Sequence, residues 1–256
     1  MPRRPKLGQH FLVSEGVARR IAALVPEGAP VIEVGPGHGA LTGHLLERAA
    51  EYLGVELDAW LAERLEARFG QRPDFSLAGM DFLRFTPPPE MGDELVLIGN
   101  IPYAVSAKIA QRATAEPRYR RAVLMFQREF AQRLTAKAGQ SDYGSLSVYI
   151  AYHWRARIAL GVSRQKFRPA PRVDSAVVEF VRRTEPPVQV AEPARFFRLV
   201  RACFARRRKQ LGNAAVGELG LEREDWLEAL AAAGIERRRR AQELDLADFA
   251  RLDRQL

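Results

Sequence analysis

The sequence has few of the side chains that build metal centres and disulfides. Cys203 is the single cysteine among 256 residues, which excludes disulfides, cysteine-rich zinc sites and iron–sulfur clusters. The four histidines stand at positions 10, 38, 44 and 153, a spacing that fits no histidine-based metal centre. We therefore expect no metal, and a lone thiol is typical of a protein of the reducing cytoplasm.

Long apolar runs are absent as well. No apolar segment follows the first residues, and no stretch approaches the ~18 uninterrupted apolar residues of a membrane span. A hydrophobic content of 47% at moderate net charge excludes intrinsic disorder. We expect a monomeric, cytoplasmic protein with no membrane partner, made of one large domain and a small appendage.

The net charge of +9 is unevenly distributed along the chain. Residues 1–99 carry 10 basic and 14 acidic side chains, whereas residues 100–184 carry 16 basic and only 5 acidic ones. The middle third therefore predicts one surface that faces a polyanion such as nucleic acid. The alternative is a solvated, solubilising face, although such faces usually mix both signs.

Short apolar runs alternate with helical patterns over the first two thirds of the chain. This alternation is typical of βαβ units and predicts an α/β fold with a mostly parallel sheet of about seven strands, closed by an antiparallel pair. The expected strands are 31–35, 52–57, 75–80, 95–99, 122–126, 146–152 and 175–181, and the expected helices are 14–25, 40–49, 58–69, 103–115 and 127–137.

The chain changes character at Glu185-Pro-Pro-Val, which we interpret as a linker. Apolar residues repeat at helical spacing beyond it, so we expect a first domain over 1–185 and a small all-helical domain over 186–256. Cys203 falls on the apolar stripe of one such helix. This position favours a packed thiol over a nucleophile.

A glycine-rich turn follows the first apolar strand. In Glu33-Val-Gly35-Pro-Gly37-His-Gly39-Ala40, glycines stand where a strand turns into a helix, so that backbone N–H groups can face a ligand. Glu56 ends the next strand, where an acidic side chain usually binds ribose hydroxyls. This pattern alone also fits a dinucleotide such as a nicotinamide cofactor.

Two further acidic residues favour S-adenosylmethionine over a dinucleotide. Glu33 lies inside an apolar strand, which suggests that its carboxylate meets the ligand or the N–H groups of the glycine loop. Asp81 ends the third strand, where it could accept a hydrogen bond from an adenine amino group. The alternative for both is capping of loop amides.

The fourth strand ends in Asn100-Ile-Pro102-Tyr103, a pattern suited to methylation of an exocyclic amine. The lone pair of an adenine amino nitrogen is delocalised into the ring. Acceptors that hold its two hydrogens, the Asn100 side chain and a backbone carbonyl around Ile101–Pro102, favour a pyramidal nitrogen aimed at a methyl donor. Tyr103 offers a stacking face for the purine, worth roughly 1–3 kcal/mol. An ordinary strand-to-helix turn with an Asn cap is the alternative.

Taken together, the motifs resemble those of the ribosomal RNA adenine N6,N6-dimethyltransferases that modify small-subunit rRNA. The resemblance covers nearly the whole chain and keeps the family's order of motifs. It rests on Gly8-Gln9-His10-Phe11-Leu12, Glu33-Val-Gly35-Pro-Gly37, Glu56-Leu-Asp58, Asn100-Ile-Pro-Tyr103, Met125-Phe-Gln127-Arg-Glu129, Tyr143-Gly144-x-Leu146-Ser147, Phe167-Arg-Pro169-Ala-Pro171-Arg-Val173-Asp-Ser175 and Phe204-Ala-Arg-Arg207-Arg208-Lys209-x-Leu211-x-Asn213.

The resemblance implies a Rossmann-like methyltransferase domain and a small helical domain that binds rRNA or the ribosome. It implies transfer of four methyl groups from S-adenosylmethionine to two adjacent adenosines in a terminal hairpin loop, during ribosome assembly. Two positions depart from the family, which usually has Asn at His10 and at Ala104. By position the resemblance assigns cofactor contacts to His10, Leu12, Gly35, Gly37, Glu56, Asp81 and Asn100, and catalysis to Asn100, Pro102 and Tyr103.

The resemblance also assigns the basic middle third to the small-subunit rRNA. A loop carries four basic residues around an aromatic one, as expected for phosphate contacts and an unstacked base, and a second cluster lies in the C-terminal part. These expected RNA contacts are Arg164, Lys166, Phe167, Arg168, Arg172, Arg207, Arg208 and Lys209.

Three alternatives remain open. The first is a large-subunit rRNA methyltransferase of the macrolide-resistance type, which shares the Asn-x-Pro-Tyr chemistry. The second is a non-catalytic RNA-binding assembly factor, against which the intact Asn100, Pro102 and Tyr103 argue. The third, a nicotinamide-dependent reductase, explains neither this motif nor the basic segment.

Overall fold

The computed structural model describes residues 10–214 and 216–256. Gly8 and Gln9, part of the first motif, lie outside the described residues. Contacts divide the chain into two units, one formed by residues up to Ala131 with Arg157–Arg182, the other by Gln132–Ala156 with Arg183–Leu256. Residues 132–156 thus group with the C-terminal helices. The domain assignment of 1–185 and 186–256 stays a prediction.

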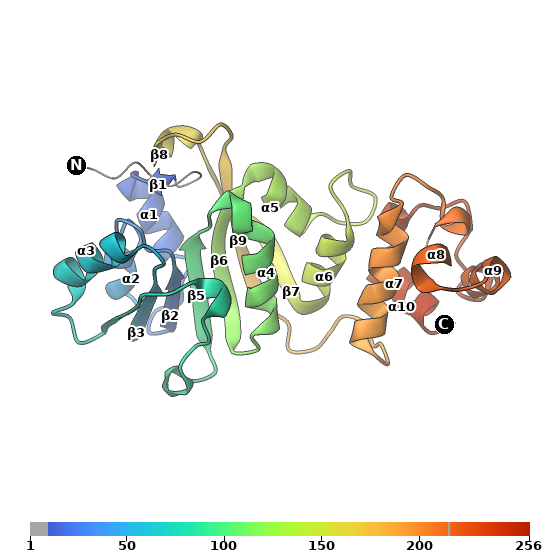
Figure 1. Ribbon diagram of the computed structural model, residues 1–256, viewed down its shortest axis with the longest axis horizontal. Helices are drawn as coiled ribbons and strands as arrows, with labels where there is room; N and C mark the ends of the chain where they lie inside the picture. The colour runs from blue at the N-terminus through green and yellow to red at the C-terminus, as the bar shows by residue number, and fades with distance from the viewer. Residues whose placement is uncertain (1–9, 215) are drawn as a thin grey trace. The chain divides into compact units, whose positions relative to one another are not determined.

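A seven-stranded sheet forms the centre of the first unit (Figure 1). Its strand order is β4-β3-β2-β5-β6-β9-β7, in which β4 to β6 run parallel and β9 pairs antiparallel to β6. The predicted α/β sheet of about seven strands is confirmed. The strands are β2 (Pro30–Val34), β3 (Glu51–Val55), β4 (Phe75–Ala78), β5 (Leu95–Asn100), β6 (Tyr119–Gln127), β7 (Trp154–Val162) and β9 (Ser175–Arg182).

Helices connect β2 to β3, β3 to β4 and β5 to β6, as parallel βαβ units require. The clearest start is that of α3, where the Asp58 side chain accepts hydrogen bonds from the N–H groups of Trp60 at 3.0 Å and Leu61 at 3.4 Å. The helices are α1 (Glu15–Ala22), α2 (Thr42–Leu46), α3 (Ala59–Phe69), α4 (Ser106–Ala115) and α5 (Arg128–Thr135), at the five predicted places.

One predicted strand is wrong. Residues 146–152 lie in helix α6 (Ser145–His153), and the seventh strand is β7, which the sequence did not predict. The segment is apolar on consecutive positions, a pattern that periodicity cannot separate from a strand. The helix start is fixed by Ser147, whose hydroxyl accepts from the Gly144 N–H at 3.0 Å and donates to the Arg133 carbonyl at 2.6 Å.

The second unit has its own apolar core. Phe196, Trp226 and Phe249 are each 0% exposed, and the Trp226 indole donates to the Leu211 carbonyl at 2.7 Å. Cys203 lies in this core, and burial raises the pKa of its thiol to about 12, so the predicted packed thiol is confirmed. The C-terminal elements are α7 (Pro193–Ala205), α8 (Val216–Leu219), α9 (Arg223–Ala232) and α10 (Leu246–Asp253).

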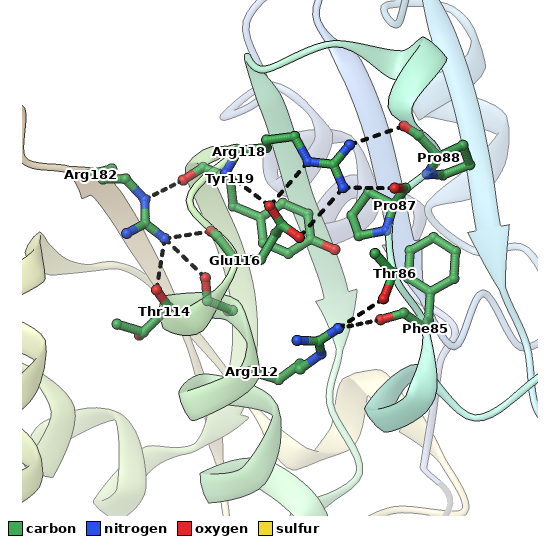
Figure 2. Close-up of polar contacts among 11 residues, drawn as sticks. Phe85, Thr86, Pro87, Pro88, Arg112, Thr114, Glu116, Arg118, Tyr119 and Arg182 are labelled. Atoms are coloured by element: carbon green, nitrogen blue, oxygen red, sulfur yellow. Dashed lines mark hydrogen bonds and ion pairs between the residues drawn. The ribbon is translucent and has the colours of Figure 1, made fainter.

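Three arginines bind backbone carbonyls at the amino end of β6 (Figure 2). Arg118 donates to the carbonyls of Pro87 at 2.6 Å and Pro88 at 3.1 Å, and pairs with Glu116 at 3.1 Å. Burial alone would raise the pKa of Glu116, but the hydrogen bonds from Arg118 outweigh it and the pKa is lowered. This network ties the end of α4 to the proline-rich loop before β5.

Arg112 and Arg182 complete the network. The Arg112 guanidinium donates to the Phe85 carbonyl at 2.7 Å, and Arg182 donates to four carbonyls of the α4–β6 connection, including that of Glu116 at 2.7 Å. These three side chains belong to the basic middle third, yet they stabilise the fold. These three side chains therefore do not belong to the surface that the sequence predicts to face a polyanion.

Replacing Arg182 tests the network. We expect Arg182→Ala to lower the free energy of unfolding by about 2–4 kcal/mol, because buried carbonyls lose their charged donor. Arg120→Ala is the control, since Arg120 pairs with the exposed Glu94 and should change stability by less than about 1 kcal/mol. Urea unfolding measures both, and an Arg182→Ala variant as stable as the control would contradict the assignment.

Candidate active site

A cavity of about 340 Å³ opens at the carboxyl ends of the parallel strands. The chain leaves β2 toward β3 on one side and returns to β5 on the other, so the strand order reverses here. Ligands of parallel α/β sheets bind at such a point. The cavity lies wholly in the first unit and is lined by His10, Phe11, Val34, Gly35, Gly37, Val55, Glu56, Leu57, Leu61, Met80, Asp81, Phe82, Leu83, Asn100, Ile101, Pro102, Tyr103, Val105 and Ile109.

The glycine loop contributes backbone to this cavity. Gly35 and Gly37 have φ of 62° and 60°, in the left-handed region that favours glycine. A Cβ on Gly37 would lie 3.1 Å from the Phe11 ring. A side chain here would meet both conformational strain and the packed Phe11.

Glu56 holds the glycine loop through a hydrogen bond to its backbone. One carboxylate oxygen accepts from the Gly37 N–H and the other from the Asp58 N–H, both at 3.0 Å, and the residue is 5% exposed. Each carboxylate oxygen can accept a second hydrogen bond. Glu56 therefore holds the loop and still has acceptor capacity toward the cavity.

Asp81 lies at the same edge, after β4. Its Oδ1 accepts from the Leu83 N–H at 2.9 Å, which is the capping role that the sequence left open. The side chain also lines the cavity. Capping one loop amide thus fixes the carboxylate at the cavity wall.

The predicted role of Glu33 is wrong. Its Oε2 accepts from the hydroxyls of Tyr52 at 2.7 Å and Thr42 at 2.8 Å, so the carboxylate bonds neither to the glycine loop nor into the cavity. Burial raises the pKa of Glu33 to about 7, although both hydroxyls lower it. Glu33 ties β2 to β3 and to the start of α2.

Asn100 ends β5 and is held by the N-terminal segment. Its side-chain N–H donates to the backbone carbonyl of His10 at 2.8 Å. This bond fixes the orientation of the amide, because the nitrogen faces His10 and the oxygen is the remaining acceptor. Asn100 also lines the cavity.

Tyr103 lies beside Asn100, with its ring centroid 5.6 Å from that of His10. Its hydroxyl is 2.9 Å from the Ser175 hydroxyl. Burial raises the pKa of the Tyr103 phenol, with the Ser175 hydrogen bond lowering it in part. The Tyr103 side chain therefore contributes an uncharged aromatic surface to the cavity. Pro102, beside it, is exposed.

A two-stranded sheet secures the N-terminal segment. Strand β1 (Phe11–Leu12) pairs antiparallel with β8 (Phe167–Arg168), and the His10 ring nitrogen Nδ1 is 2.8 Å from the Pro169 carbonyl oxygen. Leu12 is buried in the core and does not line the cavity. Through β1, the loop after β7 is connected to Asn100.

The predicted RNA residues fall into three groups. Arg164, Lys166, Arg168 and Arg172 are exposed on the loop after β7, as expected. Phe167 is 0% exposed and packs in the core, so a stacking role for it is wrong. The third group lies in the second unit and is exposed, and consists of Arg207, Arg208 and Lys209.

Several cavity residues were not predicted from the sequence. They are apolar and include Phe11, Leu57, Leu61 and Met80. Leu57 is 68% exposed directly after Glu56, so the available signal was an apolar residue beside an acidic residue that was expected to bind ribose. Within the described ranges, no three His, Cys, Asp or Glu side chains gather as metal ligands, and no helix is long and apolar enough to cross a bilayer.

Comparison with known proteins agrees with this geometry. The family model described as ribosomal RNA adenine dimethylase matches residues 2–254. A relative from Moorella thermoacetica, named ribosomal RNA small subunit methyltransferase A, is 38% identical and is matched over 100% of this chain and 93% of its own length.

Two solved structures are similar over almost their full length. A dimethyladenosine transferase from Plasmodium falciparum has a TM-score of 0.82 at 26% identity, with 95% of this chain and 96% of that chain covered. The 23S rRNA methyltransferase ErmE has a TM-score of 0.76 at 29% identity, with 96% and 99% covered. With a Rossmann-like methyltransferase fold and a match over nearly every residue, the chain belongs to the ribosomal RNA adenine dimethylase family.

Proposed function

We propose that the protein transfers methyl groups from S-adenosylmethionine to N6 of two adjacent adenosines in a terminal hairpin loop of small-subunit rRNA. The product is N6,N6-dimethyladenosine, made during ribosome assembly in the cytoplasm by a monomer. The observation that carries this proposal is Asn100, whose amide is oriented by His10 at the edge of the cavity. The name of the Moorella thermoacetica relative supports the small subunit as substrate.

The cavity fits the proposed cofactor. Its volume lies in the range of small-molecule sites, its wall is mostly apolar, and Glu56 and Asp81 stand at its edge. Glu56 suits ribose hydroxyls and Asp81 suits an adenine amino group. Gly35, Gly37 and His10 provide backbone and ring contacts, and Leu12, which is buried, holds the N-terminal segment through its pairing with Phe167.

The chain's own groups position the target base. Bound S-adenosylmethionine supplies an activated methyl group, so no general base is needed to start the transfer. The Asn100 side-chain oxygen and a backbone carbonyl near Ile101–Pro102 accept the two amino hydrogens and direct the nitrogen lone pair. The Tyr103 ring stacks on the purine.

The rRNA approaches along exposed basic side chains. Arg164, Lys166, Arg168 and Arg172 lie on the loop that β8 joins to β1, close in the chain to residues that hold His10. Arg207, Arg208 and Lys209 offer a second basic group in the other unit. The target adenosine leaves its stack to reach Tyr103. Ala104, which is exposed beside Tyr103, offers no polar contact to the target adenosine.

The ErmE structure supports a second candidate, methylation of 23S rRNA. The two functions share the Asn100 and Tyr103 chemistry and differ in the RNA. The name of the Moorella thermoacetica relative favours the small subunit.

Glu56→Ala tests the cofactor site. We expect affinity for S-adenosylmethionine to fall about 100-fold or more, because the variant loses both the ribose acceptor and the anchor of the Gly37 N–H. Isothermal titration calorimetry measures this, with Glu15→Ala as a control on α1, outside the cavity. NADH should not bind the unaltered protein, and tight NADH binding would contradict the assignment of S-adenosylmethionine as the cofactor.

The substrate is tested by mass spectrometry of rRNA digests. Unmethylated small and large subunits are incubated separately with the protein and labelled S-adenosylmethionine. We expect two N6,N6-dimethyladenosines in small-subunit rRNA and none in large-subunit rRNA. Label in the large subunit alone would instead establish the ErmE-like function.

A further inference from the structure

Helix α3 carries an aromatic and basic strip outside the cavity. Trp60, Arg64 and Arg68 stand four residues apart, so they share one face of the helix. Trp60 is 45% exposed, and the Arg64 guanidinium lies 4.8 Å from the centre of its ring. The Arg68 guanidinium lies 4.7 Å from the centre of the Phe69 ring.

The glycine loop adds His38 to this face. The His38 ring is 6.1 Å from the Trp60 ring and 4.3 Å from the Phe11 ring, between centroids. His38, Arg64 and Arg68 line a hollow together with Gly37, which also lines the cofactor cavity. We call His38, Trp60, Arg64 and Arg68 the α3 strip. It borders the proposed cofactor site from outside.

The charges of α3 are segregated rather than mixed. Glu63 and Glu66 line a different hollow with Gly70 and Gln71. A solvated helix usually intersperses both signs over its surface. The α3 strip therefore has the separated charge typical of a surface that meets an anion.

In their lack of carboxylate partners, the arginines of the α3 strip resemble the exposed arginines of the loop after β7. In residues 10–214 and 216–256, neither Arg64 nor Arg68 forms an ion pair with a carboxylate, and neither does any arginine of the loop after β7. Burial and the nearby Arg64 lower the pKa of His38, so its ring is neutral at pH 7 and can donate one hydrogen bond.

We propose that the α3 strip binds single-stranded RNA next to the adenosine that enters the cavity. Trp60 stacks on a base, as exposed aromatic side chains do in single-strand sites, and Arg64 and Arg68 contact phosphates. This proposal rests on the proposed RNA substrate and adds a contact in the acidic first third of the chain. Helix α3 then contributes Leu61 to the proposed cofactor cavity, and Trp60, Arg64 and Arg68 to the RNA.

Tryptophan fluorescence reads this contact directly. The chain has three tryptophans, and Trp154 and Trp226 are 1% and 0% exposed, so acrylamide quenching reports mainly on Trp60. The probe is a hairpin oligoribonucleotide with two adjacent adenosines in its loop. We expect it to quench Trp60 emission and to protect it from acrylamide, with no such signal in Trp60→Phe.

Binding of the same hairpin tests the arginines. We expect Arg64→Gln/Arg68→Gln to weaken binding about tenfold and to reduce the slope of log affinity against log salt by about 1.4, or about 0.7 for each lost phosphate contact. Trp60→Ala should also weaken binding about tenfold. Arg19→Gln/Arg20→Gln on α1 is the charge-matched control and should leave Trp60 quenching intact. Affinity for S-adenosylhomocysteine should not change in any of them.

Two results would overturn the proposal. One is hairpin affinity and quenching in Arg64→Gln/Arg68→Gln equal to those of the control. The other is weakened binding to intact small subunits with unchanged binding to the hairpin, which would assign the α3 strip to a ribosomal protein. If the unaltered protein methylates no rRNA while the hairpin still protects Trp60, the proposed function is wrong but the proposal that the α3 strip binds RNA is retained.

Discussion

The hydrogen bond from the Asn100 amide to the His10 carbonyl connects the parts of the active site. Asn100 is placed by the buried strand β5, while His10 is placed by β1 and its pairing with β8. The bond leaves the Asn100 oxygen as an acceptor, which the proposed transfer to an adenine amino group requires. One contact therefore joins the cavity, the proposed position of the target base and the basic loop after β7.

The sheet supplies the other constraint. Parallel strands bring residues that are far apart in sequence to one edge, and Gly35, Glu56, Asp81 and Asn100 each follow or end such a strand. Nothing else in their sequence positions would bring them together. The arginine network at the opposite end of β6 holds the carboxyl end of α4, a helix that begins at Ser106, three residues after Tyr103.

The sequence predicted the parts of the site that depend on local geometry. A glycine is favoured at position 37 because its φ lies in the left-handed region. Glu56 and Asn100 stand at the ends of apolar strands whose length and spacing can be recognised. The failures depend on partners that are distant in sequence. Glu33 bonds to Tyr52 and Thr42, and Phe167 enters the core, neither of which a local pattern shows.

Charge was the least reliable guide for the same reason. A count of basic residues does not distinguish Arg182, which binds four carbonyls, from Arg168, which is exposed.

Apolar patterns were ambiguous in two places. The prediction of a strand over 146–152 was wrong because consecutive apolar residues suit a buried helix equally well. Leu57 and Leu61 were missed because the apolar residues of a cavity wall have no distinctive sequence pattern of their own.

Single-turnover methylation by Asn100 variants tests the central claim most directly. Asn100→Asp keeps an acceptor oxygen but replaces the donor to His10 with a second acceptor, which repels that carbonyl and turns the side chain away. With cofactor and small-subunit rRNA saturating, the account predicts that Asn100→Asp and Asn100→Ala both transfer methyl about 100-fold or more slowly than the unaltered protein. An Asn100→Asp variant that transfers methyl at the unaltered rate would contradict it.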